Sequence, residues 1–194
     1  MLTIIEYITN WFWIYKRTNR AYFFQHQDFD PRKTMNKIFE KEFVGYRFIN
    51  GIIAPISDEI EVKEIEDAFT IQYNGARSHL EKALGFLSDR EKPDYKNSIK
   101  ESISAVESIC QIIVGDDKAS LGDALKDLEE KGITIHPALK GAFSKLYGYT
   151  SDEGGIRHAE GLFESNVSFE EAKFMLVSCC AFVNYLIAEY GKTI

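Results

Sequence analysis

The chain has 194 residues, of which 45% are hydrophobic and 27% charged, and its formal net charge is -7. These proportions are typical of a globular protein. The acidic balance excludes a protein that coats nucleic acid through a broad basic surface, although it is compatible with a small basic pocket. The three cysteines all lie in apolar helical segments, so we expect core thiols in a reducing cytoplasm and neither disulfides nor a metal site: Cys110, Cys179 and Cys180.

Residues 2–18 form the first predicted helix, because their apolar side chains wrap most of the way round a helical wheel. We favour a core helix of a small N-terminal region. The alternative is a membrane-surface segment, since Trp11 and Trp13 are typical of an interface. The segment has no basic start and contains Glu6, unlike a secretory signal. We therefore expect a cytoplasmic protein without a membrane partner.

A β-hairpin within residues 46–56 is the clearest local prediction. Asn50 and Gly51 separate two β-prone runs, and an Asn-Gly pair favours the type I′ turn, in which both central residues have positive φ. Pro55 should confine the second strand to an edge or an end.

Capping signals predict a helix on each side of the hairpin. Asp30 followed by Pro31 starts a helix that runs to about Phe43. After the hairpin, Ser57 or Asp58 caps a second helix. The side chains of this helix that we expect to face inward are Ile60, Ile65, Ala68 and Phe69.

Five further segments have the apolar spacing of helices, at about 73–87, 97–114, 121–128, 137–146 and 168–190. The last is capped by Ser168 with Glu171, is apolar almost throughout and should run through the middle of a bundle. His79 and His136 are interpreted as a partly buried helix residue and a capping or surface residue, not as ligands.

The predicted fold is mainly α with a small α+β N-terminal part. A module at residues 1–71 carries the hairpin, and residues 72–194 form a bundle of four to five helices.

Residues 146–163 are the candidate functional segment, and we expect them to form an ordered loop between two core helices. Arg157 and His158 lie at its centre, and no arginine other than Arg157 follows Arg90. The expectation of a loop rests on glycines that interrupt the helical spacing: Gly148, Gly154, Gly155 and Gly161.

An arginine beside a histidine suits RNA cleavage without a metal or a cofactor. His158 can transfer a proton near neutral pH, and Arg157 can clamp a phosphate through two hydrogen bonds. One protomer supplies one histidine in this segment, so a complete site would need two copies related by two-fold symmetry. The expected neighbours for phosphate contact and base stacking are Lys145, Tyr147 and Tyr149.

A purely structural role for the same residues is the alternative. Arg157 could pair with an acidic neighbour and pin the segment, while His158 packs against the end of the bundle. The acidic neighbours within reach along the chain are Asp152, Glu153 and Glu160.

Several separated motifs resemble AbiJ-type abortive infection proteins of bacteria. They are GYRFING at 45–51, HLEKAL at 79–84, NSIKESISAVE at 97–107, and LYGYTSD at 146–152 running into IRHA at 156–159. The resemblance covers roughly residues 35–190 and implies an N-terminal α+β module followed by a helical bundle of the HEPN class, which is found in prokaryotic ribonucleases and toxins. Relatives of this kind imply a shortened N-terminal module here, in which Trp11, Phe12 and Trp13 would line a face for a missing segment or a protein partner.

Ribonucleases of the HEPN class place a histidine four to six residues after their arginine. Here His158 directly follows Arg157, and no histidine comes later in the chain. The resemblance therefore implies the fold more firmly than the catalysis.

Two kinds of function follow from these observations. The first is a toxin-like effector of phage defence that acts on RNA as a metal-independent ribonuclease or RNA-binding protein, working as a homodimer. The second is a non-catalytic HEPN-like interaction module that binds a partner protein or a nucleotide.

Overall fold

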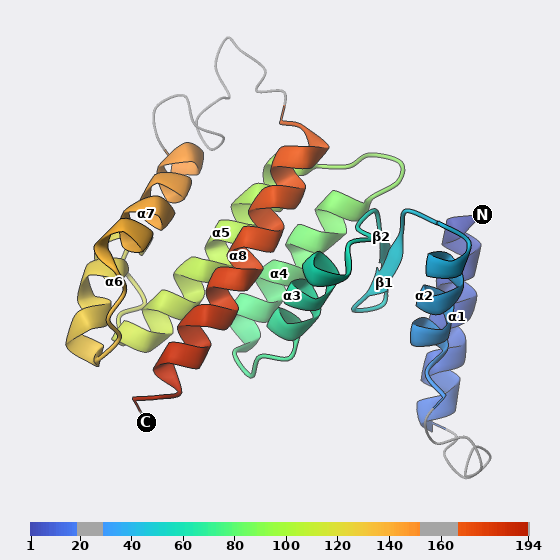
Figure 1. Cartoon of the computed structure of the whole chain (residues 1–194), viewed down its shortest axis with the longest axis horizontal. Coiled ribbons are helices and arrows are strands. Elements are labelled where there is room, and N and C mark those ends of the chain that lie inside the picture. Colours follow the sequence, from blue (N-terminus) through green and yellow to red (C-terminus); the bar gives the residue numbers. More distant parts are fainter. Residues whose placement is uncertain (19–28, 152–166, 194) are drawn as a thin grey trace. The chain divides into compact units, whose positions relative to one another are not determined.

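A computed structural model of the chain describes residues 1–18, 29–151 and 167–193. Over these ranges the chain forms eight α-helices, one short 3-10 helix and one two-stranded antiparallel sheet (Figure 1). The prediction of a mainly helical fold with one hairpin is confirmed. The chain divides into two compact units, Met1–Lys63 and Glu64–Ile194. The domain boundary expected between residues 71 and 72 stays a prediction.

The N-terminal unit is built around the predicted hairpin. Strand β1 (Arg47–Ile49) pairs with β2 (Ile52–Ala54), with Phe48 opposite Ile53. The φ angles are +47° at Asn50 and +86° at Gly51, as the Asn-Gly sequence predicts for a type I′ turn.

Side chains of two helices make hydrogen bonds to the backbone at both outer edges of this sheet. Asn36 of α2 (Pro31–Lys41) donates to the Phe48 carbonyl over 2.9 Å and accepts from the Phe48 N–H over 2.6 Å. On the other edge, Glu6 of α1 (Leu2–Thr18) accepts from the Ile53 N–H over 2.6 Å. These bonds attach the hairpin to both helices. The attachment matters because a two-stranded sheet alone in water is only marginally stable.

An apolar cluster packs between α2 and the hairpin. Phe39 of α2 and Phe48 of β1 stack with their ring centroids 6.2 Å apart, and both are buried with Ile53. The partly buried side chains packed against this cluster are Leu2, Ile5, Met35, Val44 and Tyr46.

Helix α1 is a core helix on one side only, which differs from our expectation. Its sole buried residue is Thr9, and Asn10 on the same side donates to the Gly51 carbonyl over 2.6 Å. Trp11 is exposed whereas Phe12 and Trp13 are half-buried, because consecutive helical residues point about 100° apart. The three side chains thus differ in exposure, and the expected aromatic face for a missing segment or a protein partner stays a prediction.

The second unit contains the end of α3 (Glu59–Phe69) and four longer helices. They are α4 (Asn74–Ser88), α5 (Tyr95–Val114), α7 (Pro137–Ser151) and α8 (Phe169–Tyr190), with α6 (Leu121–Asp127) and a 3-10 turn (Leu128–Lys131) between α5 and α7. Ile65, Ala68 and Phe69 of α3 are buried as predicted, but Ile60 is 75% exposed. Ile60 precedes Ile65 by five residues, which turns it about 140° away from the buried face.

Helix α5, and not α8 as we predicted, is the central element of this unit. It contacts α4, α8, α6 and α7, whereas α8 contacts chiefly α5 and α4. Small buried residues allow this close packing, and Ser98 satisfies its hydroxyl by donating to the Ala83 carbonyl over 2.8 Å. His79 lies half-buried on α4 with Nδ1 2.6 Å from the Glu101 carboxylate of α5, so its interpretation as a helix residue is confirmed.

Helix α8 buries one side and carries two of the three core cysteines. Cys110, Cys179 and Cys180 are buried free thiols, as expected, and burial raises the pKa of Cys179 to about 12. Among the described residues, α8 alone is long and apolar enough to cross a membrane by length and composition. Of the window that meets this test, 44% is buried inside the protein.

Replacing Gly51 with alanine should destabilise the N-terminal unit. A Cβ at this position would lie 2.9 Å from Arg32 Nη2, and the residue has a positive φ, so we expect a loss of about 1–2 kcal/mol in the free energy of unfolding. Thermal unfolding followed by tryptophan fluorescence measures this, because both tryptophans lie on α1. Gly45→Ala is the control, since its Cβ would meet nothing within 4 Å. Equal losses in the two variants would contradict the assignment of the turn.

Candidate functional site

The two residues predicted to be catalytic, Arg157 and His158, fall in the segment 152–166, which lies outside the described residues. The structure does describe the two helix ends that flank this segment. Helix α7 ends at Ser151 and α8 begins at Phe169. The loop that we expected from residue 146 is thus helical through residue 151, so its start is corrected by six residues.

The three predicted RNA-contact residues do not share one face of α7. Lys145 and Tyr149 are four residues apart and lie about 40° apart around the helix, whereas Tyr147 points about 200° from Lys145. Lys145 and Tyr149 are exposed and Tyr147 is half-buried. The exposed face of α7 therefore offers one cation and one aromatic ring.

Glu171 joins the end of α7 to the start of α8. The Tyr149 hydroxyl donates to Glu171 Oε1 over 2.8 Å. Glu171 Oε2 accepts from the Ser168 N–H over 2.8 Å, and the Glu171 N–H donates to the Ser168 hydroxyl over 3.1 Å. This is the predicted capping box, so one carboxylate both caps α8 and holds α7 next to it.

The pKa values of this pair shift in opposite directions. Partial burial, then the hydrogen bond to Glu171, raise the pKa of Tyr149 to about 12. The Ser168 N–H and then the Tyr149 hydroxyl lower the pKa of Glu171. Tyr149 is therefore a neutral donor and Glu171 an ionised acceptor near neutral pH, which is the pairing that gives a strong hydrogen bond.

Aromatic packing further along the same two helices supports the junction. Phe143 of α7 stacks on Phe182 of α8 with the planes 9° from parallel, and Phe182 also stacks with Tyr185. The two helices thus contact each other at two levels, through Tyr149 with Glu171 and through Phe143 with Phe182.

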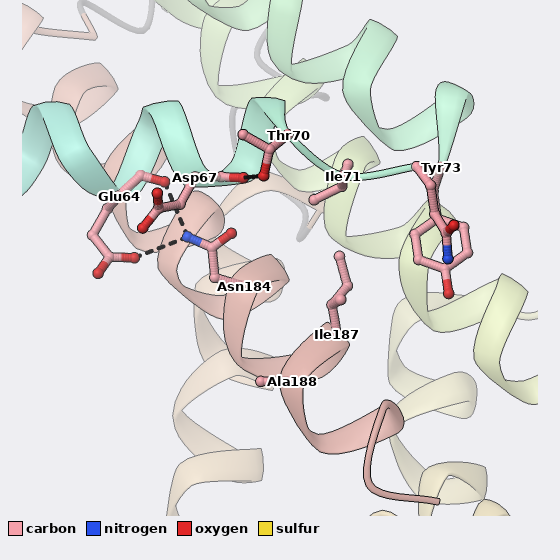
Figure 2. Close-up of a pocket in the computed structure, with 9 residues that line it drawn as sticks. Glu64, Asp67, Thr70, Ile71, Tyr73, Asn184, Ile187 and Ala188 are labelled. Carbon is pink, nitrogen blue, oxygen red and sulfur yellow. Dashed lines mark hydrogen bonds between the residues drawn. The ribbon is translucent and has the colours of Figure 1, made fainter. Parts of the chain in front are cut away.

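A separate open pocket lies between the end of α3 and the last turns of α8 (Figure 2). Its volume is about 540 Å³. Asn184 donates to both the carbonyl and the carboxylate of Glu64, each over 3.0 Å. The other lining residues are Asp67, Thr70, Ile71, Gln72, Tyr73, Ile187 and Ala188.

The carboxylates of this pocket make it unsuitable for a phosphate group. Glu64 and Asp67 would repel an anion, and the carbonyl end of α8 adds partial negative charge. We did not predict the pocket from the sequence. The available signal was Asn184, a polar residue within the apolar run of α8, which the structure explains as a partner of the α3 backbone.

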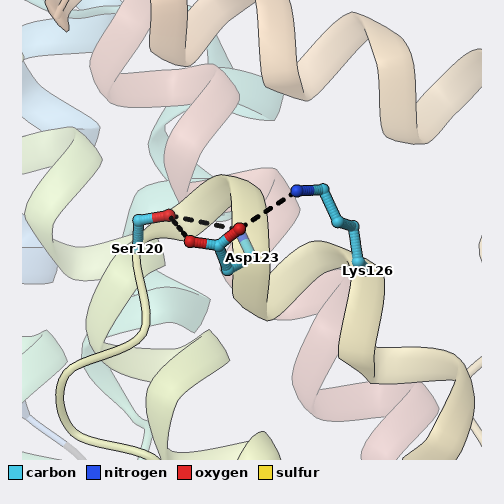
Figure 3. A network of polar contacts seen from close by, with 3 residues as sticks. All are labelled: Ser120, Asp123 and Lys126. Carbon is cyan, nitrogen blue, oxygen red and sulfur yellow. Dashed lines mark hydrogen bonds and ion pairs between the residues drawn. The ribbon is translucent and has the colours of Figure 1, made fainter.

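A polar cluster at the start of α6 is a helix cap (Figure 3). The Ser120 hydroxyl donates to Asp123 Oδ2 over 2.7 Å and accepts from the Asp123 N–H over 3.2 Å, while Lys126 lies 3.0 Å from Asp123 Oδ1. His136 likewise accepts the Ala138 N–H at the start of α7, as predicted. Within the ranges that the structure describes, no three His, Cys, Asp or Glu side chains gather as metal ligands would.

The first unit is a small α+β module, in which two helices pack against a two-stranded hairpin. Residues 1–70, which include this module, match the family model described as AbiJ N-terminal domain 4. The N-terminal part of the chain is thus similar to AbiJ N-terminal domains, and this family name points to abortive infection, a form of phage defence. No curated protein and no solved structure matches the chain.

The match confirms the resemblance to AbiJ proteins in one part of the chain. We drew that resemblance mainly on residues 35–190, whereas the matched residues are 1–70. The matched residues do not include the helical unit, so the match gives no support to a HEPN class for it.

Tyr149→Phe should weaken the junction between α7 and α8 by about 1 kcal/mol or less, because it removes one partly exposed hydrogen bond and keeps the ring. Since folding raises the pKa of Tyr149 to about 12, its contribution should be complete below about pH 10, the pKa of a free tyrosine, and disappear as the pH rises to about 12. Denaturant unfolding of both proteins across this range measures the difference.

Tyr95→Phe is the matched control. The Tyr95 ring packs edge-on against Phe169 of α8, and its hydroxyl makes no hydrogen bond within the part of the chain that the structure describes. Its removal should leave stability unchanged, and a Tyr149→Phe protein with the same alkaline profile as the wild type would refute the junction.

Proposed function

We propose that the protein is an abortive-infection effector whose helical unit acts on RNA, as a metal-independent HEPN-type ribonuclease or as an RNA-binding protein. The AbiJ-type domain at residues 1–70 supports the role in phage defence. The observation that carries the proposal for RNA is the Tyr149–Glu171 hydrogen bond. It anchors, at one end of the bundle, the two helices between which Arg157 and His158 occur in the sequence.

The proposed chemistry needs no metal. His158 would take the proton from the 2′-hydroxyl of the RNA, and Arg157 would stabilise the charge on the pentacoordinate phosphorus. A second copy would supply the histidine that protonates the leaving oxygen, because no histidine follows His158. The complete site in this proposal therefore belongs to a homodimer.

Neighbouring residues support binding of a flexible RNA strand. Lys145 is exposed and can contact a phosphate, and the exposed ring of Tyr149 can stack on a base while its hydroxyl stays bonded to Glu171. Tyr147 points to a different side of α7, so it contributes least to this surface.

A non-catalytic interaction module is the second candidate. It is favoured by the exposed apolar side chains of α1, because apolar patches rimmed by polar residues mark interaction surfaces. A nucleotide is the weaker choice of ligand for such a module, since the pocket beside α8 is lined by Glu64 and Asp67.

His158→Ala should abolish RNA cleavage if the first candidate is correct. Loss of a general acid–base group typically costs 10²–10⁴-fold in rate, so we expect at least about a 10²-fold loss on single-stranded RNA, measured in the presence of a chelator. Induced expression should slow the growth of the host, and His158→Ala should relieve it. His136→Ala is the control, because His136 caps α7. Equal growth of cells expressing the wild type and His158→Ala would favour the second candidate.

Lys145→Ala should weaken RNA binding without changing its sequence preference. Removing one phosphate contact should reduce the slope of log affinity against log salt by about 0.7 for a single strand. Fluorescence anisotropy of a labelled oligonucleotide at several salt concentrations measures this slope. Lys118→Ala serves as the control, since Lys118 is also an exposed cation and lies before α6. An identical loss in both variants would mean that Lys145 has no specific place in binding.

A further inference from the structure

Helix α1 exposes a continuous apolar face. Six residues with helical spacing form this face, which we name the α1 stripe, and each is 41–72% exposed: Ile4, Tyr7, Ile8, Trp11, Ile14 and Tyr15. Trp11 and Tyr15 stack with their centroids 5.2 Å apart and their planes 14° from parallel. The stripe therefore presents ordered aromatic surface to its surroundings.

The rotation of α1 is set by polar bonds on its other side. Glu6 accepts from the Ile53 N–H and Asn10 donates to the Gly51 carbonyl, each over 2.6 Å, and Asn10 also accepts from Arg32 Nε over 2.8 Å. The side of α1 that carries these polar groups thus faces the hairpin, and the more apolar side faces outward. This is opposite to the rotation that burial of apolar area alone would give.

The stripe itself carries no charge. The two cations of α1 lie at its C-terminal end, and both are engaged: Lys16 donates to the Phe29 carbonyl, and the Arg17 guanidinium lies 4.6 Å from the Trp13 ring centroid. Two identical surfaces repel each other when their centres carry like charges. The α1 stripe has no charged residue, so two stripes can pack on each other without this repulsion.

We propose that the α1 stripe binds a second copy of this chain, with the two stripes packed on each other across a two-fold axis. Aromatic side chains each offer 150–250 Å², so the exposed part of the six residues is on the order of 700 Å². That is close to the roughly 800 Å² per partner of a stable interface. Tyr7 and Trp11 near its centre are of the residue types that dominate interface energies.

Charge argues against a membrane surface as the occupant. Helices that lie in a membrane interface combine an apolar face with a face rich in lysine and arginine. The opposite side of α1 instead faces the hairpin with Glu6 and Asn10, and the whole chain has a net charge of -7, which anionic lipids would repel. This inference does not depend on RNA cleavage.

The oligomeric state of the full chain tests the proposal. Sedimentation equilibrium over a range of concentrations should give a reversible dimer. The double variant Ile8→Glu with Trp11→Glu should raise the dimer dissociation constant at least 100-fold, because it places four carboxylates in one interface. Ile60→Glu is the control, since Ile60 is 75% exposed on α3 and outside the stripe, and it should dimerise as the wild type does. Circular dichroism checks that all variants keep their helices.

Fluorescence of Trp11 in a Trp13→Phe protein identifies the occupant. A blue shift that grows with protein concentration, along the same curve as dimer formation, supports the proposal. Blue emission from a sample that sedimentation shows to be monomeric would mean that the same chain covers the stripe. A shift only with phosphatidylserine–phosphatidylcholine vesicles would mean a membrane, and either result overturns the proposal. A monomer at all concentrations, or a dimer unaffected by the double variant, also overturns it. RNA cleavage measured on the same samples is a separate readout.

Discussion

The structure of the N-terminal unit depends on the hydrogen bonds that helix side chains make to the backbone groups on the outer edges of its two-stranded sheet. Phe48 and Ile53 face each other across the hairpin, and their backbone groups point outward at a position where a larger sheet would add further strands. Asn36 bonds to the backbone of Phe48 on one edge, and Glu6 accepts from the Ile53 N–H on the other. Because these two residues belong to different helices, the same bonds that complete the sheet fix the place and rotation of α1 and α2.

In the helical unit, a single carboxylate links two helices. Glu171 caps α8 with Ser168, and it also accepts the hydroxyl of Tyr149 from the last turn of α7. This side-chain bond links the last turn of α7 to the first turn of α8, the two helix ends between which the proposed catalytic residues occur in the sequence.

Local signals were predictable from the sequence, whereas rotations and helix ends without a strong cap were not. The Asn50–Gly51 turn and the caps at Asp30 and Ser168 depend on residues within four positions of each other, so the sequence specifies them. The outward face of α1 depends on bonds to residues 41 and 47 positions away. Ile60 was misplaced for the related reason that an apolar residue need not face the core. Of the candidate site, the sequence predicted the helices that flank it and the cap at Ser168, but the bond between Tyr149 and Glu171 spans 22 positions.

The two proposals rest on different residues and can fail separately. A ribonuclease that uses one histidine per chain needs its copies to meet, and a net charge of -7 opposes that meeting unless apolar area compensates for it. The α1 stripe is a source of such area in the unit that contains the AbiJ-type module, and it carries no charge of its own. If the stripe pairs and RNA is not cut, the N-terminal domain is an assembly device for an interaction module. If RNA is cut by a dimer that ignores the stripe, the helical unit must contain its own symmetric contact, and the apolar face of α1 is then left for a different protein partner.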